Sequence, residues 1–166
     1  MELPQRKPNR LPDFDYSSPG AYFLTICTKD HKCLLGHIVG ASIARPPAMQ
    51  LSQCGRIVEK AILEIPKHYP AISVDHYTVM PNHIHLLLHI CTDADGRAML
   101  APTISHVVQQ MKGIVTKQVG YSIWQKLFHD HVIRGEADYL KIWEYIENNP
   151  ARWKEDCFYK DTLEKP

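Results

Sequence analysis

The chain alternates between segments with the period of a strand and segments with the period of a helix. Strands are predicted where β-branched, aromatic and other apolar residues run together or alternate with polar ones, over residues 21–28, 72–80, 83–90 and 128–134. Helices are predicted where apolar residues recur at helical spacing, over residues 52–65, 103–115 and 136–148. A hairpin-like excursion with Gly40 and Pro46-Pro47 in its loop is expected over residues 36–51.

Polar caps and prolines predict where these helices begin and end. Ser52 is the expected N-cap of the first helix and Pro66 its end, while Pro102-Thr103 opens the second. Pro150 ends the third helix, because proline disfavours helical geometry in the residue before it. The apolar residues of this last helix are expected to face the core: Tyr139, Ile142, Trp143 and Ile146.

The order strand, helix, strand, strand, helix, strand, helix matches the split βαβ, or ferredoxin-like, pattern. We therefore predict an α+β fold, with an antiparallel sheet, helices on one face and an added C-terminal helix. The first and third strands would form the central pair. The 166 residues suit one domain, expected at 20–153 between an extended N-terminal arm, 1–19, and a C-terminal tail, 154–166.

Two histidines flank one isoleucine at the start of the segment 83–90. Side chains at i and i+2 of a strand share a face, so His83 and His85 would lie side by side while Ile84 faces the core. Burying an imidazole without a partner costs on the order of 1–3 kcal/mol. A divalent metal bound by both rings is therefore the favoured interpretation, against two ordinary strand histidines.

A second pair with the same spacing competes for the role of metal site. His129 and His131 are also i and i+2 on a predicted strand, but the residue between them, Asp130, anchors that strand less clearly. His76 and His89 are interpreted as structural or surface residues.

Tyr145 lies on the predicted last helix, where it either packs against neighbours such as Ile142 or acts as a nucleophile. Asn149 follows four residues later, near the same helix face. Its amide oxygen would complete a histidine, histidine and asparagine set for Mg²⁺ or Mn²⁺. Because Pro150 disfavours helical geometry at Asn149, Asn148 and a plain helix cap at Asn149 stay open as alternatives.

The bulk composition excludes several classes of protein. A formal net charge of +1 argues against wrapping long duplex DNA by charge alone, although local basic patches are compatible with it. Five cysteines without a C-x-x-C pair argue against a disulfide framework and against a structural zinc site. No apolar run approaches the ~20 residues that span a bilayer, and the N-terminus has no signal-peptide pattern, so a cytoplasmic protein is expected.

Four segments resemble those of the single-tyrosine HUH transposases, and among these the REP-associated tyrosine transposases: 22–25, 79–87, 130–134 and 145–150. The strings M-P-N-H-x-H and Y-I-x-x-N-P are specific when they occur together. The resemblance runs from about Tyr16 to Trp153 and therefore covers most of the chain.

The resemblance implies a metal-dependent enzyme that nicks single-stranded DNA with imperfect hairpins and transfers the strand through a 5′-phosphotyrosine. By position, His83 and His85 would hold Mg²⁺ or Mn²⁺, Asn149 would be the third ligand, and Tyr145 would be the nucleophile. His131 and Glu144 are weak candidates for the base. A monomer and a homodimer both stay open, because in some dimers of the family the tyrosine acts on the partner's metal site.

Basic residues are the candidates for contacts with DNA. They are Arg6, Lys7, Arg10, Lys112, Lys117 and Arg134. For Arg134 the alternative is a structural ion pair. For the three residues of the N-terminal arm the alternative is a disordered tail without a role in binding. Two rival functions remain. One is a metal-dependent phosphoesterase that uses water, and the other is a non-catalytic protein that binds DNA hairpins.

Overall fold

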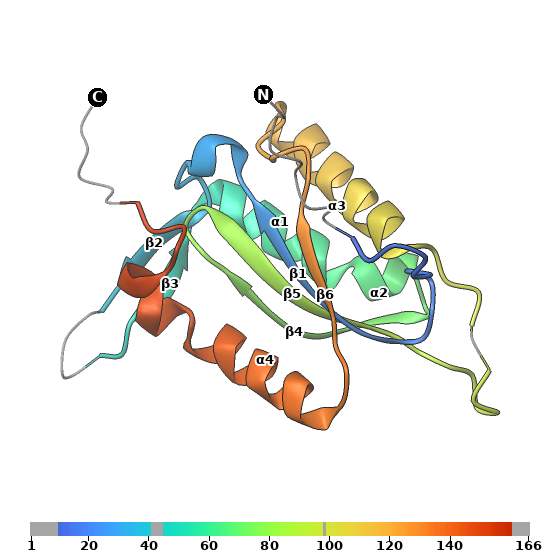
Figure 1. Ribbon diagram of the computed structural model, residues 1–166. Coiled ribbons are helices and arrows are strands. Elements are labelled where there is room, and N and C mark those ends of the chain that lie inside the picture. Colours follow the sequence, from blue (N-terminus) through green and yellow to red (C-terminus); the bar gives the residue numbers. More distant parts are fainter. Residues whose placement is uncertain (1–9, 41–44, 98, 161–166) are drawn as a thin grey trace, which may run out of the picture.

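The computed structural model describes residues 10–40, 45–97 and 99–160. Four strands form one antiparallel sheet in the order β4-β5-β1-β6 (Figure 1). They are β1 (Gly20–Cys27), β4 (Ile72–Val79), β5 (His83–Ile90) and β6 (His129–Val132). The central pair is β1 and β5, paired from Gly20 opposite Ile90 to Cys27 opposite His83. The α+β, ferredoxin-like prediction and its central strand pair are confirmed.

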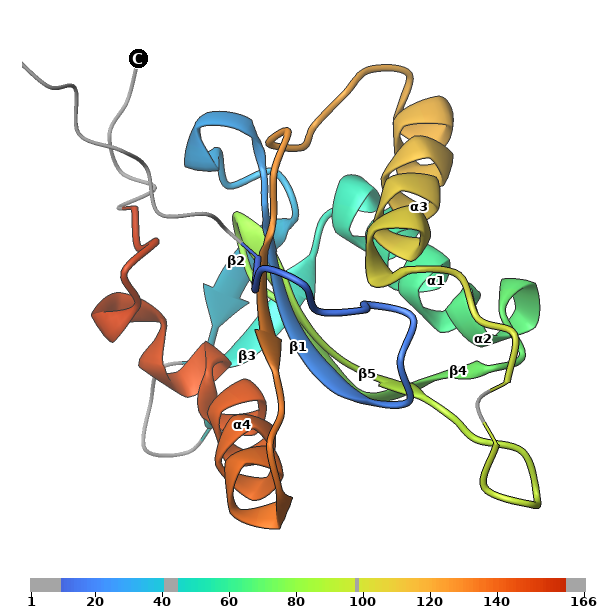
Figure 2. The ribbon, with the colours of Figure 1, turned by 45° about the vertical axis from the view of Figure 1, so that its right-hand side comes forward.

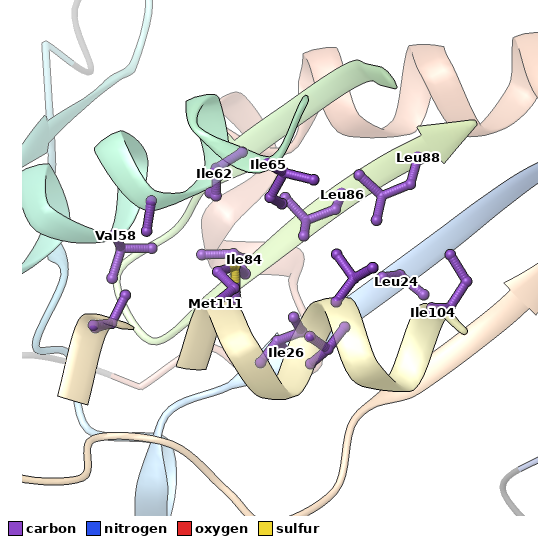
Figure 3. Close-up of a cluster of buried hydrophobic side chains, with 14 of the residues drawn as sticks. Leu24, Ile26, Val58, Ile62, Ile65, Ile84, Leu86, Leu88, Ile104 and Met111 are labelled. Atoms are coloured by element: carbon purple, nitrogen blue, oxygen red, sulfur yellow. The ribbon is translucent and has the colours of Figure 1, made fainter. Parts of the chain in front are cut away.

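Two helices, α1 (Gln53–Leu63) and α3 (Ile104–Val119), cover one face of the sheet (Figure 2). The apolar layer between them and the sheet takes alternate residues of the central strands, among them Leu24, Ile84 and Leu86, all fully buried (Figure 3). Burying one such side chain contributes roughly 1.5–3 kcal/mol. This layer makes β1 and β5 a rigid support for the side chains on their other face.

Both predicted N-caps are present. The Ser52 hydroxyl accepts from the Gly55 amide at 3.0 Å, and the Thr103 hydroxyl accepts from the His106 amide at 3.3 Å. The prediction that Pro66 ends the first helix is wrong. Pro66 lies in the first turn of a separate short helix, α2 (Ile65–His68), where a proline costs no hydrogen bond.

The opposite face of the sheet is covered by α4 (Glu136–Asn148), which lies against β4 (Figure 1). Of the four apolar residues of α4 that were expected to face the core, only Ile146 is buried. Tyr139 and Trp143 face β4 but stay partly in solvent: Tyr139 donates to Asp75 at 2.9 Å, and Trp143, 38% exposed, stacks on a histidine of that strand. The side of the helix that is turned away from the sheet stays in solvent. Strand β6 is likewise an edge strand with alternating exposed residues, not a core strand.

The predicted excursion is a hairpin of β2 (Gly36–Val39) and β3 (Ala48–Leu51). Two short 3₁₀ helices, η1 (Lys29–His31) and η2 (Pro150–Glu155), flank the same end of the sheet, and η2 contacts β3 (Figure 1). No helix in the described ranges is both long and apolar enough to cross a membrane.

The described part of the predicted arm, residues 10–19, turns and packs against the domain instead of extending. Tyr16 is only 8% exposed, and its carbonyl accepts from the Ile104 amide at 3.2 Å. The predicted boundaries at 19 and 153 stay predictions.

Candidate metal centre

His83 and His85 project from β5 toward the α4 side of the sheet, opposite Ile84. Both are buried, with exposed fractions of 0% and 2%. Their Nε2 atoms lie 3.1 Å apart. Two metal–ligand bonds of ~2.1 Å that meet at a right angle span about 3 Å, so this spacing suits two ligands of one cation.

Hydrogen bonds at the far ring nitrogens hold both imidazoles in place. Nδ1 of His83 is 2.9 Å from the Asn82 side-chain oxygen, and Nδ1 of His85 is 2.9 Å from the Thr25 hydroxyl. The Asn82 amide nitrogen donates to the carbonyls of His31 at 3.1 Å and Phe158 at 2.8 Å, so its oxygen must face His83. The proton of His83 is then on Nδ1, and the lone pair of Nε2 faces His85.

Burial keeps both rings neutral. It lowers the pKa of His83 to about 4, with nearby Asp156 opposing the shift, and it lowers the pKa of His85 well below its ordinary value. Neutral imidazole is the form that binds a metal. The lone pair on Nε2 of His83 faces Nε2 of His85 at 3.1 Å, a gap that either a proton on His85 or a cation bound by both nitrogens can bridge. These residues therefore fit a bound cation.

Asp156 is a third potential ligand, which the sequence did not indicate. Its side chain is 2% exposed, and one carboxylate oxygen lies 3.7 Å from Nε2 of His83. Ligand atoms of Asp156 and both histidines all lie within 4.8 Å of one another. Asp156 belongs to the predicted tail, which η2 turns back over the sheet. The only signal is the acidic pair Glu155-Asp156 among aromatic residues, at 153–159, and no periodicity points to it.

Asn149 lies at the same centre. Its side chain is 4% exposed, its nitrogen donates to Asp156 at 3.4 Å, and its oxygen is buried with no hydrogen-bond partner among the described residues. A buried amide oxygen without a donor fits a cation ligand. The backbone at Asn149 stays helical, with φ −60° and ψ −42°, because Pro150 opens η2. The helical spacing from Tyr145 to Asn149 is therefore kept.

Tyr145 lies on the face of α4 that is turned to the histidines. Its ring centroid is 5.2 Å from that of His85 and 6.0 Å from that of Phe23, while 43% of the residue remains exposed. Partial burial, and then the charge of Asp156, raise the pKa of the phenol. One chain therefore brings together two imidazoles, a carboxylate, an amide and an accessible phenol.

No protein-family model matches the chain. An uncharacterized protein of Haemophilus influenzae is 34% identical over 94% of both chains. A second protein of that organism, named "Putative REP-associated tyrosine transposase", is 24% identical over 89% of this chain and 85% of its own. The fold matches that of a REP-associated tyrosine transposase solved with a REP hairpin, at a TM-score of 0.60 and 21% identity, over 92% of this chain and 74% of the other. In sequence and in fold, the chain is similar to REP-associated tyrosine transposases.

Within this fold, the competing histidine pair lies away from the buried centre. His129 and His131 are exposed on the edge strand β6, and His131 contacts Asp138 at 2.8 Å. His76 stacks on Trp143, with ring centroids 4.3 Å apart. These are surface contacts, and only His83 and His85 share a buried face.

The basic residues proposed for DNA are scattered over the protein. Arg6 and Lys7 lie outside the described residues. Arg10 packs over the Phe128 ring at 5.2 Å. Lys112 donates to the Gln125 carbonyl at 2.8 Å and so ties α3 to a loop. Lys117 is exposed on α3, and Arg134 is exposed after β6. The described members of this set do not gather at the metal centre.

Proposed function

We propose that the protein cuts single-stranded DNA that carries imperfect hairpins, and rejoins the ends, through a covalent bond to Tyr145. The observation that supports this most is the position of the Tyr145 ring, 5.2 Å from the ring of His85, within one chain. His85 in turn shares a buried face with His83. The site can therefore be assembled by a monomer, although a homodimer remains compatible with it.

A divalent metal ion fits the centre. His83, His85 and Asp156 would hold it, and the Asn149 oxygen would be a further ligand. Carboxylate and amide oxygens beside imidazole suit Mg²⁺ or Mn²⁺. Such an ion, when bound, supplies electrostatic stabilisation of the charge that builds up on a phosphate.

Tyr145 would attack the scissile phosphorus. A bond forms between the phenolic oxygen and phosphorus as the bond to the 3′ oxygen breaks, and the phenol's proton ends on the released 3′ hydroxyl. Attack by the 3′ hydroxyl of another strand reverses the step and joins new ends. Because the pKa of this phenol is raised, it is protonated at neutral pH, and its proton must leave during the attack.

The REP hairpin held by the structural relative supports a DNA hairpin as substrate. The exposed ring of Tyr145 is accessible to a strand from solvent, as this chemistry requires. A phosphoesterase that uses water and a non-catalytic hairpin binder are the alternatives that the experiment below separates.

The test is Tyr145→Phe, incubated with single-stranded hairpin oligonucleotides and Mn²⁺ and run on a denaturing gel. We expect the covalent adduct to vanish while hairpin affinity persists. Tyr121→Phe, which removes a hydroxyl from an exposed tyrosine elsewhere, is the control and should form the adduct. A Tyr145→Phe variant that still links to DNA would refute the nucleophile. Turnover without any adduct would favour water, and binding without cleavage would favour the non-catalytic protein.

The metal is tested by titrating Mn²⁺ into the double variant His83→Ala with His85→Ala in a calorimeter. We expect binding to be lost. The matched control, His129→Ala with His131→Ala, should bind as the unmodified protein does. The reverse result would assign the metal to β6.

A further inference from the structure

A cavity of about 800 Å³ lies between the β2–β3 hairpin and the segment 150–160, and nothing in the proposed reaction uses it. Its volume is in the range of small-molecule sites. Its walls come from both structures, with Ile38 and Pro47 on the hairpin side and Trp153 and Tyr159 on the other. The cavity is therefore built by segments that are far apart in the sequence.

The cavity adjoins the metal centre. Pro81, in the connection just before Asn82 and His83, lines it, and the Pro81 carbonyl is fixed by the Leu35 amide at 3.0 Å. The ring of Trp153 lies 6.0 Å from that of His83. The cavity is therefore close enough to the metal centre for the same strand to reach both.

The charge around the cavity differs from that of the whole chain. Arg152, Lys154 and Lys160 line it against a single carboxylate, Glu155, while the chain carries only +1. Lys160 donates to the Asp30 carbonyl at 2.6 Å. Among the described residues, no salt bridge engages Arg152 or Lys154. Two cations are thus free to meet phosphate oxygens.

The other walls suit a nucleobase. Trp153 and Tyr159 lie with ring centroids 5.3 Å apart at an angle of 68°, so they form an aromatic corner. Bases stack on such rings with little regard to sequence, for about 1–3 kcal/mol per base. Basic and aromatic side chains that face one cavity are the recognition chemistry of single-stranded nucleic acid.

We propose that this cavity binds an unpaired nucleotide of the same DNA strand, beside the one that is cut. The base packs against Trp153 and Tyr159, and Arg152 and Lys154 neutralise its phosphates. This proposal rests on the proposed function, since it takes the strand from the metal centre. The cavity would favour single-stranded DNA, because a base that is paired in a duplex cannot enter it.

The test measures binding of a fluorescein-labelled, single-stranded thymidylate oligonucleotide by anisotropy over a range of salt. It uses the Tyr145→Phe background, so that covalent chemistry plays no part. We expect Arg152→Gln with Lys154→Gln to weaken binding several-fold. The slope of log affinity against log salt should fall by about 1.4, for two lost phosphate contacts. Lys60→Gln with Lys67→Gln removes the same charge from exposed positions on α1 and α2 and should change neither quantity.

Equal losses in both double variants, or an unchanged slope in the first, would overturn the proposal, as would a parent Tyr145→Phe protein that does not bind the oligonucleotide. A second measurement does not depend on charge. An oligonucleotide that carries 4-thiothymidine, irradiated on the protein, should crosslink within 150–160 or the β2–β3 hairpin, and crosslinks found only elsewhere would refute the cavity. If the cavity results are as expected but the protein with Tyr145 forms no covalent adduct, the proposed function is wrong and the cavity proposal still holds.

Discussion

The two faces of strand β5 show how one strand serves both stability and chemistry. Toward α1 and α3 it presents Ile84, Leu86 and Leu88, all fully buried among apolar side chains. Toward α4 it presents His83 and His85, also buried but surrounded by polar partners. Because successive side chains alternate, the apolar layer fixes the backbone that the imidazoles need.

The faces differ also in how they are covered. Two helices seal the apolar face, whereas the histidine face is covered by α4 and by the segment around Trp153 and Phe158, and Leu140, Trp143 and Tyr145 of α4 remain between 38% and 57% exposed. The apolar face thus behaves as a core, and the histidine face as a half-open site. Three changes separate these two roles, from the largest expected effect to the smallest.

Leu86→Ala should have the largest effect, because it opens a void in the sealed layer. We expect a loss of about 2–5 kcal/mol in the free energy of unfolding, measured with urea. Leu140→Ala, on the exposed flank of α4, should stay within about 0.5 kcal/mol. Similar losses in the two variants would show that both faces are equally packed, which would contradict the difference between a sealed and a half-open face.

Acid should destabilise the metal-free protein through the histidine face. The folded pKa of His83 is about 4, below its ordinary value of 6.5, so between these values the unfolded chain binds the extra proton. The free energy of unfolding should therefore fall as the pH drops from 6.5 towards 4, by up to about 3 kcal/mol from His83, and this group should have no effect above 6.5.

Urea unfolding of the metal-free protein at several pH values measures this loss. His83→Gln should reduce the dependence to the part that His85 contributes, while His129→Gln, at an exposed position on β6, should leave it unchanged. A His83→Gln protein with the full acid sensitivity would show that the imidazole is already protonated in the fold.

Asn82→Leu should have the smallest of the three effects, since it touches the metal only through His83. Without the oxygen that fixes its Nδ1 proton, the imidazole loses its orientation, and Mn²⁺ affinity should drop about 10- to 100-fold by calorimetry. Asn148→Leu removes an amide from an exposed position and should leave the affinity unchanged. Unchanged affinity in the Asn82 variant would mean that β5 alone positions the ring.

The sequence predicts the features that depend on periodicity. It does not predict those that depend on the path of the chain between distant segments. Alternation on β5 predicted that His83 and His85 share a face, and the spacing to Asn149 was enough to bring it near Tyr145. Asp156 could not be found this way, because its place depends on the irregular turn of η2. Periodicity also shows that α4 has an apolar stripe, but it does not show how much of the helix other elements cover.

The Asn82 side chain joins parts of the protein that are far apart in the sequence. Its nitrogen bonds the carbonyls of His31 and Phe158, and its oxygen faces the ring of His83. If the residues around Phe158 were to leave the surface, an amide hydrogen next to the imidazole would lose its acceptor. The NMR resonances of the His83 ring nitrogens would shift on that loss, so they report whether the segment around Phe158 is packed against β5.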